Sequence, residues 1–307
     1  MLHADVATDA GLKERIIAFA GSASIEATPH DENRLPELTA TLRPGTTVYI
    51  AHPPRWLLQD VIRIAVKVQQ LGFPARPHVV ARALQGERQL RSALSELNAA
   101  GIDQVLLIAG DASTPDGPYS STIDVLETGG MLGGGMNTVA VAGHPEGHRL
   151  IPSETLWDAL RAKQAFGQRT GTHVEIVTQF GFDSHNIFDW RRACLARGIT
   201  LPAHIGLAGP TPLPKLIRFA MQCGIGASLR GVRRNAGALA GLSGMATTPE
   251  EMVTDLVRLG AEDQRLSIAK PHFFCFGGSL DTARWLRKIV EGAFDLSDDR
   301  SRFSVRN

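Results

Sequence analysis

The chain has 307 residues, of which 43% are hydrophobic, and its 32 basic and 31 acidic residues leave a formal charge of +1. This balance removes the general electrostatic case for binding nucleic acid or a membrane surface, so a small-molecule substrate becomes the default expectation. Cys194, Cys223 and Cys275 are too few and too widely spaced for a disulfide framework or a thiolate zinc site, and we expect buried free thiols.

The start of the chain, residues 1–9, carries acidic groups where a signal peptide needs basic ones, and it lacks an apolar core. No later segment approaches an uninterrupted apolar stretch of about 18 residues. We therefore expect a cytoplasmic protein without a membrane span.

Short runs rich in valine, isoleucine and other apolar residues predict eight strands. These runs cover residues 22–28, 46–52, 76–81, 104–110, 137–143, 174–180, 203–209 and 272–276. Helical periodicity lies between them, most clearly over 56–71, which ends at Gly72, and over 87–100. A further helix is expected to start with a cap at Thr248.

Most of these strands are continuous apolar runs, as parallel strands covered by helices require. Eight strands alternating with helices predict an α/β fold, a (β/α)8 TIM barrel, in which residues 1–307 form a single catalytic domain. The long interval between the seventh and eighth strands is expected to hold extra helices. An open doubly wound sheet is the main alternative.

Polar residues stand at the carboxyl ends of successive strands, where barrel enzymes carry their chemistry. In chain order they are Glu26, His52, His78, Asp111, His144 with His148, and Gln179 with Asp183. Each alone is more often a cap or a satisfied polar group than a catalytic residue. Their shared position favours one active site built from several strand ends, with Glu26 as the candidate proton donor.

Other motifs give weaker or negative signals. The glycine-rich residues 129–135 precede a strand, whereas a dinucleotide fingerprint must follow one, so we expect no Rossmann site. Residues 277–279 fit either a phosphate site or a tight turn with a serine cap. The histidines lack HxH or HExxH spacing, and we expect no metal site. The cluster of Arg230, Arg233 and Arg234 fits either a clamp for a phosphate or glutamate tail or a solvated face.

Six segments match, in order and approximate spacing, the motifs of one enzyme family. They are Ser24-Ile25-Glu26-Ala27-Thr28-Pro29-His30 for a first-strand S-F-E-F-F-P-P signature, Pro77-His78 for P-H, Ala109-Gly110-Asp111 for R-G-D, His144-Pro145-Glu146-Gly147-His148 for Y-P-E-x-H, Thr178-Gln179-Phe180-Gly181-Phe182-Asp183 for T-Q-F-F-F-D, and His272-Phe273-Phe274 for H-F-Y. With these segments the chain resembles the methylenetetrahydrofolate reductase family over nearly its whole length.

The resemblance implies a (β/α)8 barrel that passes hydride from NADH or NADPH, through bound FAD, to 5,10-methylenetetrahydrofolate, giving 5-methyltetrahydrofolate, or runs in reverse. Glu26 would be the general acid that protonates a folate nitrogen as the five-membered ring opens to an iminium. Asp111 would hold the pterin or tune the flavin, and Gln179 and Phe180 would bind folate. The residues near the cofactor would be His52, His78, Ala109, Asp111, Tyr119, Ser120, His144, His148 and Lys163.

Departures from the family pattern fall mainly on the flavin side. Ala109 stands where an arginine is expected, Ala51 where a threonine is expected, and His144 where a tyrosine is expected. Each loses a contact worth on the order of 1–3 kcal/mol. A flavin-independent reductase with direct hydride transfer is therefore an alternative. A folate-binding barrel without catalysis and a pterin-dependent methyltransferase are further alternatives. A homo-oligomer is compatible with the sequence.

Overall fold

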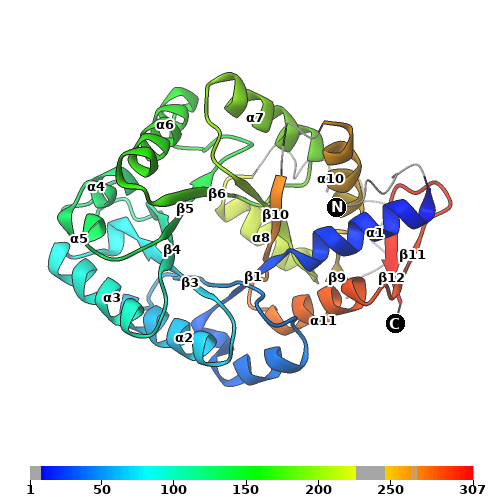
Figure 1. Ribbon diagram of the computed structural model, residues 1–307, viewed down its shortest axis with the longest axis horizontal. Coiled ribbons are helices and arrows are strands. Elements are labelled where there is room, and N and C mark those ends of the chain that lie inside the picture. The colour runs from blue at the N-terminus through cyan, green and yellow to red at the C-terminus, as the bar shows by residue number, and fades with distance from the viewer. Residues whose placement is uncertain (1–7, 226–245, 264–265, 267, 307) are drawn as a thin grey trace.

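Eight parallel strands close into a barrel in the computed structural model of the protein, in the order β1-β10-β7-β6-β5-β4-β3-β2 (Figure 1). The structure describes residues 8–225, 246–263, 266 and 268–306. The barrel strands are β1 (Ser24–Ala27), β2 (Val48–Ile50), β3 (Ala75–Val80), β4 (Gln104–Ile108), β5 (Thr138–Gly143), β6 (His173–Thr178), β7 (Ala203–Ala208) and β10 (Ile268–Phe274). The predicted (β/α)8 barrel is confirmed.

Helices surround the barrel, and the interval between β7 and β10 holds α8 and α10, as the sequence predicts. The helical elements are α1 (Asp9–Gly21), η1 (Pro29–Ala40), α2 (Leu58–Gln70), η2 (Ala81–Ala83), α3 (Glu87–Ala99), α4 (Thr122–Leu126), α5 (Gly129–Leu132), α6 (Ser153–Thr170), α7 (Ser184–Ala196), α8 (Leu213–Gln222), α10 (Glu250–Glu262) and α11 (Ser279–Val290). Two short antiparallel pairs lie outside the barrel, β8 (Thr211–Pro212) with β9 (Ala246–Thr247) and β11 (Phe294–Leu296) with β12 (Phe303–Val305).

Most predicted boundaries lie within two residues of those in the structure, and two of the differences have a visible cause or consequence. The eighth barrel strand begins at Ile268, four residues before the predicted start, because Lys270 and Pro271 interrupt the apolar run but still pair with β7. The helix expected to be capped at Thr248 has Pro249 as its N-cap, with no hydrogen bond from a capping side chain. At the start of β10, pairing with β7 decides the boundary, rather than the local apolar pattern.

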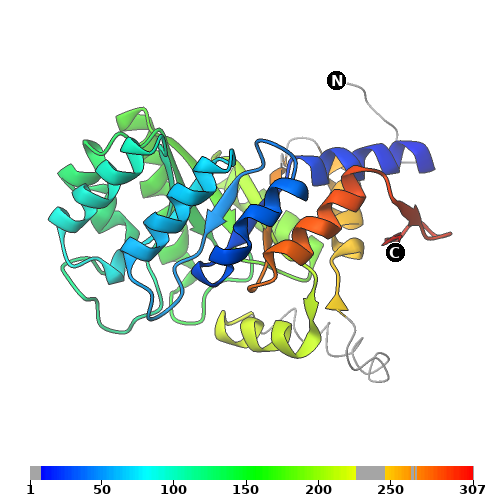
Figure 2. The same ribbon diagram turned by 90° about the horizontal axis from the view of Figure 1, so that it is seen from below.

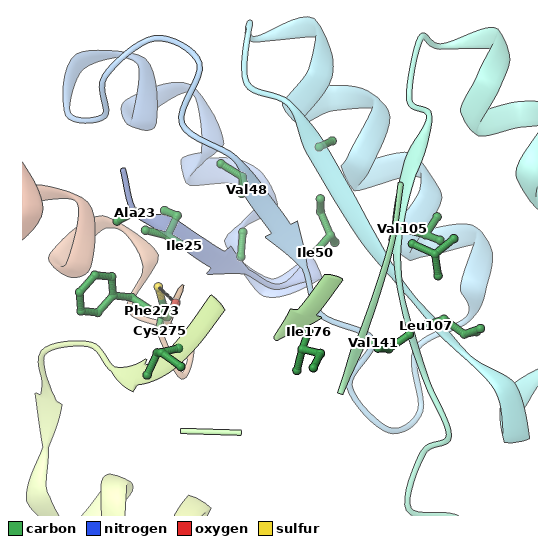
Figure 3. Packing of buried hydrophobic residues seen from close by; sticks show 14 of the residues in the cluster. Ala23, Ile25, Val48, Ile50, Val105, Leu107, Val141, Ile176, Phe273 and Cys275 are labelled. Atoms are coloured by element: carbon green, nitrogen blue, oxygen red, sulfur yellow. Dashed lines mark hydrogen bonds between the residues drawn. The ribbon is translucent and has the colours of Figure 1, made fainter. Parts of the chain in front are cut away.

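Side chains alternate along each barrel strand, so that one set of apolar residues packs against the helices, and the other set, which faces the interior, contains both polar residues and an apolar cluster of Tyr49, Leu106, Ala140 and Val177. On β6, Ile176 belongs to the main hydrophobic core, whereas the preceding Glu175 contacts Arg76 of β3. Since β3 and β6 are not neighbours in the barrel, this contact crosses its interior. Figure 3 shows the core residues that project from the strands, including Ile25, Val48, Ile50, Val105, Leu107, Val141, Ile176 and Phe273.

A buried ion pair occupies the interior of the barrel. The Arg76 guanidinium donates to the carboxylate of Glu175 and to the hydroxyl of Tyr49, and its Nε donates to Gln104 Oε1 at 3.1 Å. The Nε2 atom of His204 lies 3.4 Å from Glu175 Oε2. Burial alone would raise the pKa of Glu175, but the charge of Arg76 and its hydrogen bond hold that pKa below its ordinary value. Glu175 therefore remains an anion inside the barrel.

Removing the cation of this pair should destabilise the fold strongly. Arg76→Met leaves the Glu175 charge buried and unpaired, and we expect the free energy of unfolding to fall by roughly 3–5 kcal/mol. Urea denaturation followed by circular dichroism at pH 7 measures the change. The matched control is Arg161→Met, which removes an exposed pair with Asp158 and should cost less than about 1 kcal/mol. Equal losses in the two variants would contradict the role given to the interior pair.

Candidate active site

The carboxyl ends of the barrel strands lie together at one end of the protein, because all eight strands are parallel. Helix α8 follows the carboxyl end of β7, and Figure 2 shows α8 and the β8–β9 pair projecting from one side of the barrel. The residues predicted from strand ends therefore share this end, and their contacts show which of them meet.

Glu26 lies in the last half of β1, and its side chain points into the barrel. It is 9% exposed, and its Oε2 atom lies 4.0 Å from Nε2 of His78 on β3. Burial, and then the charge of Asp31, raise the pKa of Glu26 to about 8. A carboxyl group with this pKa keeps its proton at neutral pH, which is the state that a general acid requires.

Asp31, on η1, is held in place at the start of α11. Its Oδ2 atom accepts from the backbone and the hydroxyl of Thr28, each at 2.8 Å, and its Oδ1 atom accepts from the Ser279 hydroxyl at 2.8 Å. The expected tight turn lies just before α11, where the backbone of Gly278 donates to the Cys275 carbonyl at 2.8 Å and Gly277 has φ 78°. The expected serine cap is wrong, because Gly278 is the N-cap and the Ser279 hydroxyl donates to Asp31 instead. A carboxylate at this helix start disfavours a phosphate there.

Asp111 and Glu26 both influence the pKa of one thiol, that of Cys223 at the end of α8. Burial, then the charge of Asp111 and last that of ionised Glu26, raise the pKa of the Cys223 thiol to about 11, although its hydrogen bond with Gln179 lowers it. Gln179 belongs to the same group, because its amide nitrogen donates to the Cys223 carbonyl at 2.8 Å. The structure thus brings Glu26 of β1, Asp111 after β4 and Gln179 after β6 near the carboxyl end of one helix. Asp111 itself is exposed to solvent.

Phe180 lies beneath α8 rather than on the surface of the site. It is 2% exposed, and its ring centroid lies 5.1 Å from that of Phe276 and 5.6 Å from that of Phe274. Leu216 and Ala220 of α8 complete this apolar cluster. In this conformation Phe180, the residue after Gln179, packs within the apolar cluster under α8. Its predicted contact with folate stays a prediction.

Two histidines, His52 and His78, each have a buried ring nitrogen without a hydrogen-bond partner among the described residues. The Nε2 atom of His52 bonds to the carbonyl of Trp56 at 2.8 Å, whereas His52 Nδ1 and His78 Nε2 are buried without a partner among the described residues. Burial, and then the proximity of His52, lower the pKa of His78 to about 3. His78 is therefore neutral at physiological pH.

A second basic group consists of two histidines that follow β5 and a lysine within α6. The rings of His144 and His148 are 5.3 Å apart, and Lys163 of α6 is 6% exposed. Burial lowers the pKa of Lys163 to about 8, and burial, then His148 and Lys163, lower the pKa of His144 to about 4. These three predicted cofactor residues thus lie together and offer nitrogen donors to an anion.

The remaining predicted cofactor residues offer few free donors. The backbone and hydroxyl of Ser120 both donate to Asp124, at 2.8 and 2.9 Å. Tyr119 is 6% exposed within the main core, where burial and then Glu87 raise its pKa. Ala109 carries no charge, and its carbonyl accepts from the backbone of Arg82. The chain therefore fits the phosphate and ribose arm of a flavin poorly at these positions.

The other sequence predictions have mixed outcomes. Arg230, Arg233 and Arg234 lie outside the described residues. All three cysteines are free, two of them buried, but Cys223 is only half-buried. Within the described ranges we find no cluster of three His, Cys, Asp or Glu residues suited to a metal ion, and no helix both long and apolar enough to cross a membrane.

Two cavities lie on the outside of the barrel, away from these residues. One, of about 240 Å³, lies between α1 and α11 and is lined by Ala20, Leu42 and Val290, among others. The other, of about 550 Å³, lies between α2 and α3. Neither is lined by Glu26, Asp111 or Gln179, so the convergence of side chains, rather than a cavity, defines the candidate site.

Several residues of the site region are not predicted from the sequence. Asp31 and Cys223 face Glu26, and His272 of β10 binds the Ser24 hydroxyl through Nδ1 at 2.9 Å. A polar residue between apolar neighbours within a strand, as at His272 and Glu175, is the signal that could have identified the interior positions. Asp31 and Cys223 lie outside the strands and carry no such signal.

No protein-family model matches the chain. Among solved structures, the chain is similar to the complete multifunctional pyruvate carboxylase from Rhizobium etli, with a TM-score of 0.47 and 9% sequence identity over 87% of this chain and 25% of that chain. The chain thus spans about a quarter of the length of that protein. A likeness at this level carries no argument about activity.

The raised pKa of Glu26 predicts a pH-dependent stability. The folded protein keeps this proton up to about pH 8, whereas the unfolded chain releases it near 4.5, so rising pH favours unfolding between these values. Glu26→Gln removes this effect. The free energy of unfolding of the variant, relative to the wild type, should increase by roughly 2–4 kcal/mol between pH 5 and pH 8 in urea denaturation. Parallel curves for the two proteins would contradict the buried, protonated state.

Proposed function

We propose that the protein is a reductase that transfers hydride from a nicotinamide nucleotide to 5,10-methylenetetrahydrofolate, giving 5-methyltetrahydrofolate. The observation that carries the proposal is the buried carboxyl of Glu26, which keeps its proton at neutral pH. Glu26 and Asp111 both influence the pKa of the Cys223 thiol, which links these two residues to one region. The choice of substrate rests on the motifs that resemble those of methylenetetrahydrofolate reductases. A cytoplasmic location, where both substrates occur, is part of this proposal.

Glu26 would supply the proton that opens the five-membered ring of the substrate. As its proton moves to the folate nitrogen, the bond between that nitrogen and the methylene carbon breaks. The other nitrogen then forms an iminium with this carbon, which accepts hydride and becomes a methyl group. Glu26 is left as a carboxylate in a site that disfavours its charge, so it takes up a proton again.

Asp111 and Gln179 would position the pterin and oppose the developing positive charge. Asp111 follows Gly110, whose φ of 89° turns the chain at the end of β4. A carboxylate facing the iminium stabilises it electrostatically. Gln179 is held by the Cys223 carbonyl through its amide nitrogen, which leaves its amide oxygen to accept from the pterin.

The hydride carrier has two candidates. The family resemblance favours FAD, and His144, His148 and Lys163 would hold its anionic part. FAD would supply a ring that accepts hydride from the nicotinamide and passes it on. The second candidate is a direct transfer from the nicotinamide. It is favoured by the lack of free hydrogen-bond donors around Ala109, Tyr119 and Ser120, because the Ser120 donors already bind Asp124. In both cases Glu26 has the same role.

Replacing the proposed acid should separate turnover from binding. Glu26→Gln keeps the shape of the side chain but has no acidic proton, so we expect turnover with NADH and methylenetetrahydrofolate to fall by about 10²–10⁴-fold. The affinity for 5-methyltetrahydrofolate, measured by calorimetry, should change much less. Undiminished turnover in this variant would refute the proposed acid. A wild-type protein that binds folate but has no turnover would indicate the non-catalytic barrel.

The role of flavin is tested on the purified protein. If FAD carries the hydride, the protein or its mixture with FAD shows a flavin absorption spectrum that NADH bleaches, and activity rises with added FAD. If transfer is direct, colourless protein reduces methylenetetrahydrofolate at a rate that does not respond to FAD. In the first case Lys163→Met should weaken FAD binding, because it removes the buried cation.

A further inference from the structure

Glu26 and His78 form a buried pair that the interior of the barrel isolates from solvent. They belong to β1 and β3, on either side of β2, and their side chains are 11% and 8% exposed. The 4.0 Å between Glu26 Oε2 and His78 Nε2 exceeds a direct hydrogen bond by about 1 Å. A direct hydrogen bond between them therefore requires a change in a side-chain torsion. No other described group bonds to the Nε2 atom.

The groups that face the pair decide its charge. Glu26 faces Asp31 of η1 and the thiols of Cys223 and Cys275, whereas His78 faces His52, His272 and the ring of Tyr49. Glu26 thus faces an anion and two thiols, whereas His78 faces two imidazoles and an aromatic ring. An ion pair of carboxylate and imidazolium is therefore disfavoured on both sides, since burial raises the pKa of Glu26 and lowers that of His78.

In the neutral pair the two groups are complementary. A protonated carboxyl has one O–H donor, and a neutral imidazole has one nitrogen that accepts. A buried acceptor without a partner costs free energy, so closing the gap between them is favourable. The Glu26 carboxyl lies 4.0 Å from this unpaired nitrogen and can supply the donor.

We propose that the Nε2 atom of His78 accepts a hydrogen bond from the protonated carboxyl of Glu26 and holds the acid in its proton-bearing orientation until the substrate binds. His78 is then a positioning residue, and its role rests on the proposed function of Glu26 as the acid. During turnover the proton leaves Glu26 for the folate nitrogen while His78 stays neutral. After product release, Glu26 takes a new proton from solvent and restores the bond to His78.

An infrared difference spectrum between the wild type and Glu26→Gln, without any ligand, tests this bond. The protonated carboxyl of Glu26 has its own carbonyl stretch, whose frequency is lowered when the group donates a hydrogen bond. We expect the band to shift to higher frequency in His78→Met, which has no such acceptor, and to remain near its wild-type position in His78→Gln, which retains one. An unchanged band in His78→Met would overturn the proposal.

The matched control is His204→Met, which removes another buried imidazole of the barrel, one that contacts Glu175 rather than Glu26. The Glu26 band should not move in this variant. A shift as large as that in His78→Met would show that any loss of a buried imidazole alters the band, and the proposal would fall.

A measurement on the wild type alone does not depend on whether the variants fold. In protein labelled with ¹⁵N-histidine, the Nε2 resonance of His78 should shift as Glu26 loses its proton near pH 8. A resonance that stays constant through this range would overturn the proposal. Neither spectrum needs folate, so a protein with this bond and no reductase activity would refute the proposed function and leave the pairing intact.

Discussion

Burial of the Glu26 carboxyl is the constraint on which the candidate site depends. A carboxyl group at the surface loses its proton near pH 4, but this one is surrounded by barrel strands and by an acidic neighbour, which raise its pKa to about 8. The protein thereby keeps a carboxylic acid at neutral pH. The neutral imidazole of His78 beside it matters equally, because a cation there would favour the ionised form.

The two faces of the barrel strands have different roles, one in packing and the other in the candidate site. The outward faces of the strands pack against the helices and form the main core, whereas the interior carries polar groups. The Arg76–Glu175 pair lies in the interior; Glu26 is in register with Arg76 through Tyr49, and His78 lies two residues beyond Arg76, nearer the carboxyl end of β3. Helix α8 contributes the Cys223 carbonyl that holds Gln179. The buried charge of Glu175 is therefore neutralised by Arg76 inside the barrel, and the acid Glu26 lies near the carboxyl end of β1.

The sequence predicts the architecture well, because apolar runs with helices between them report directly on parallel strands covered on one face. It also places Glu26, Asp111 and Gln179 at strand ends that meet. It does not predict Asp31 or Cys223, since the contacts of these residues arise only when η1 and α8 fold over the barrel. Ser120 illustrates the converse, because its position suits a cofactor contact while its donors bind Asp124 within the same loop. Hydrogen bonds of this kind cannot be read from residue types alone.

A crystal structure of the protein with 5-methyltetrahydrofolate tests the central claim most directly. The account predicts that the pterin lies at the carboxyl ends of the strands between Glu26 and Asp111, with a folate nitrogen within hydrogen-bonding distance of the Glu26 carboxyl and the Gln179 amide on the pterin. A pterin bound in one of the outer cavities, or one at the strand ends that leaves Glu26 without contact, would contradict it.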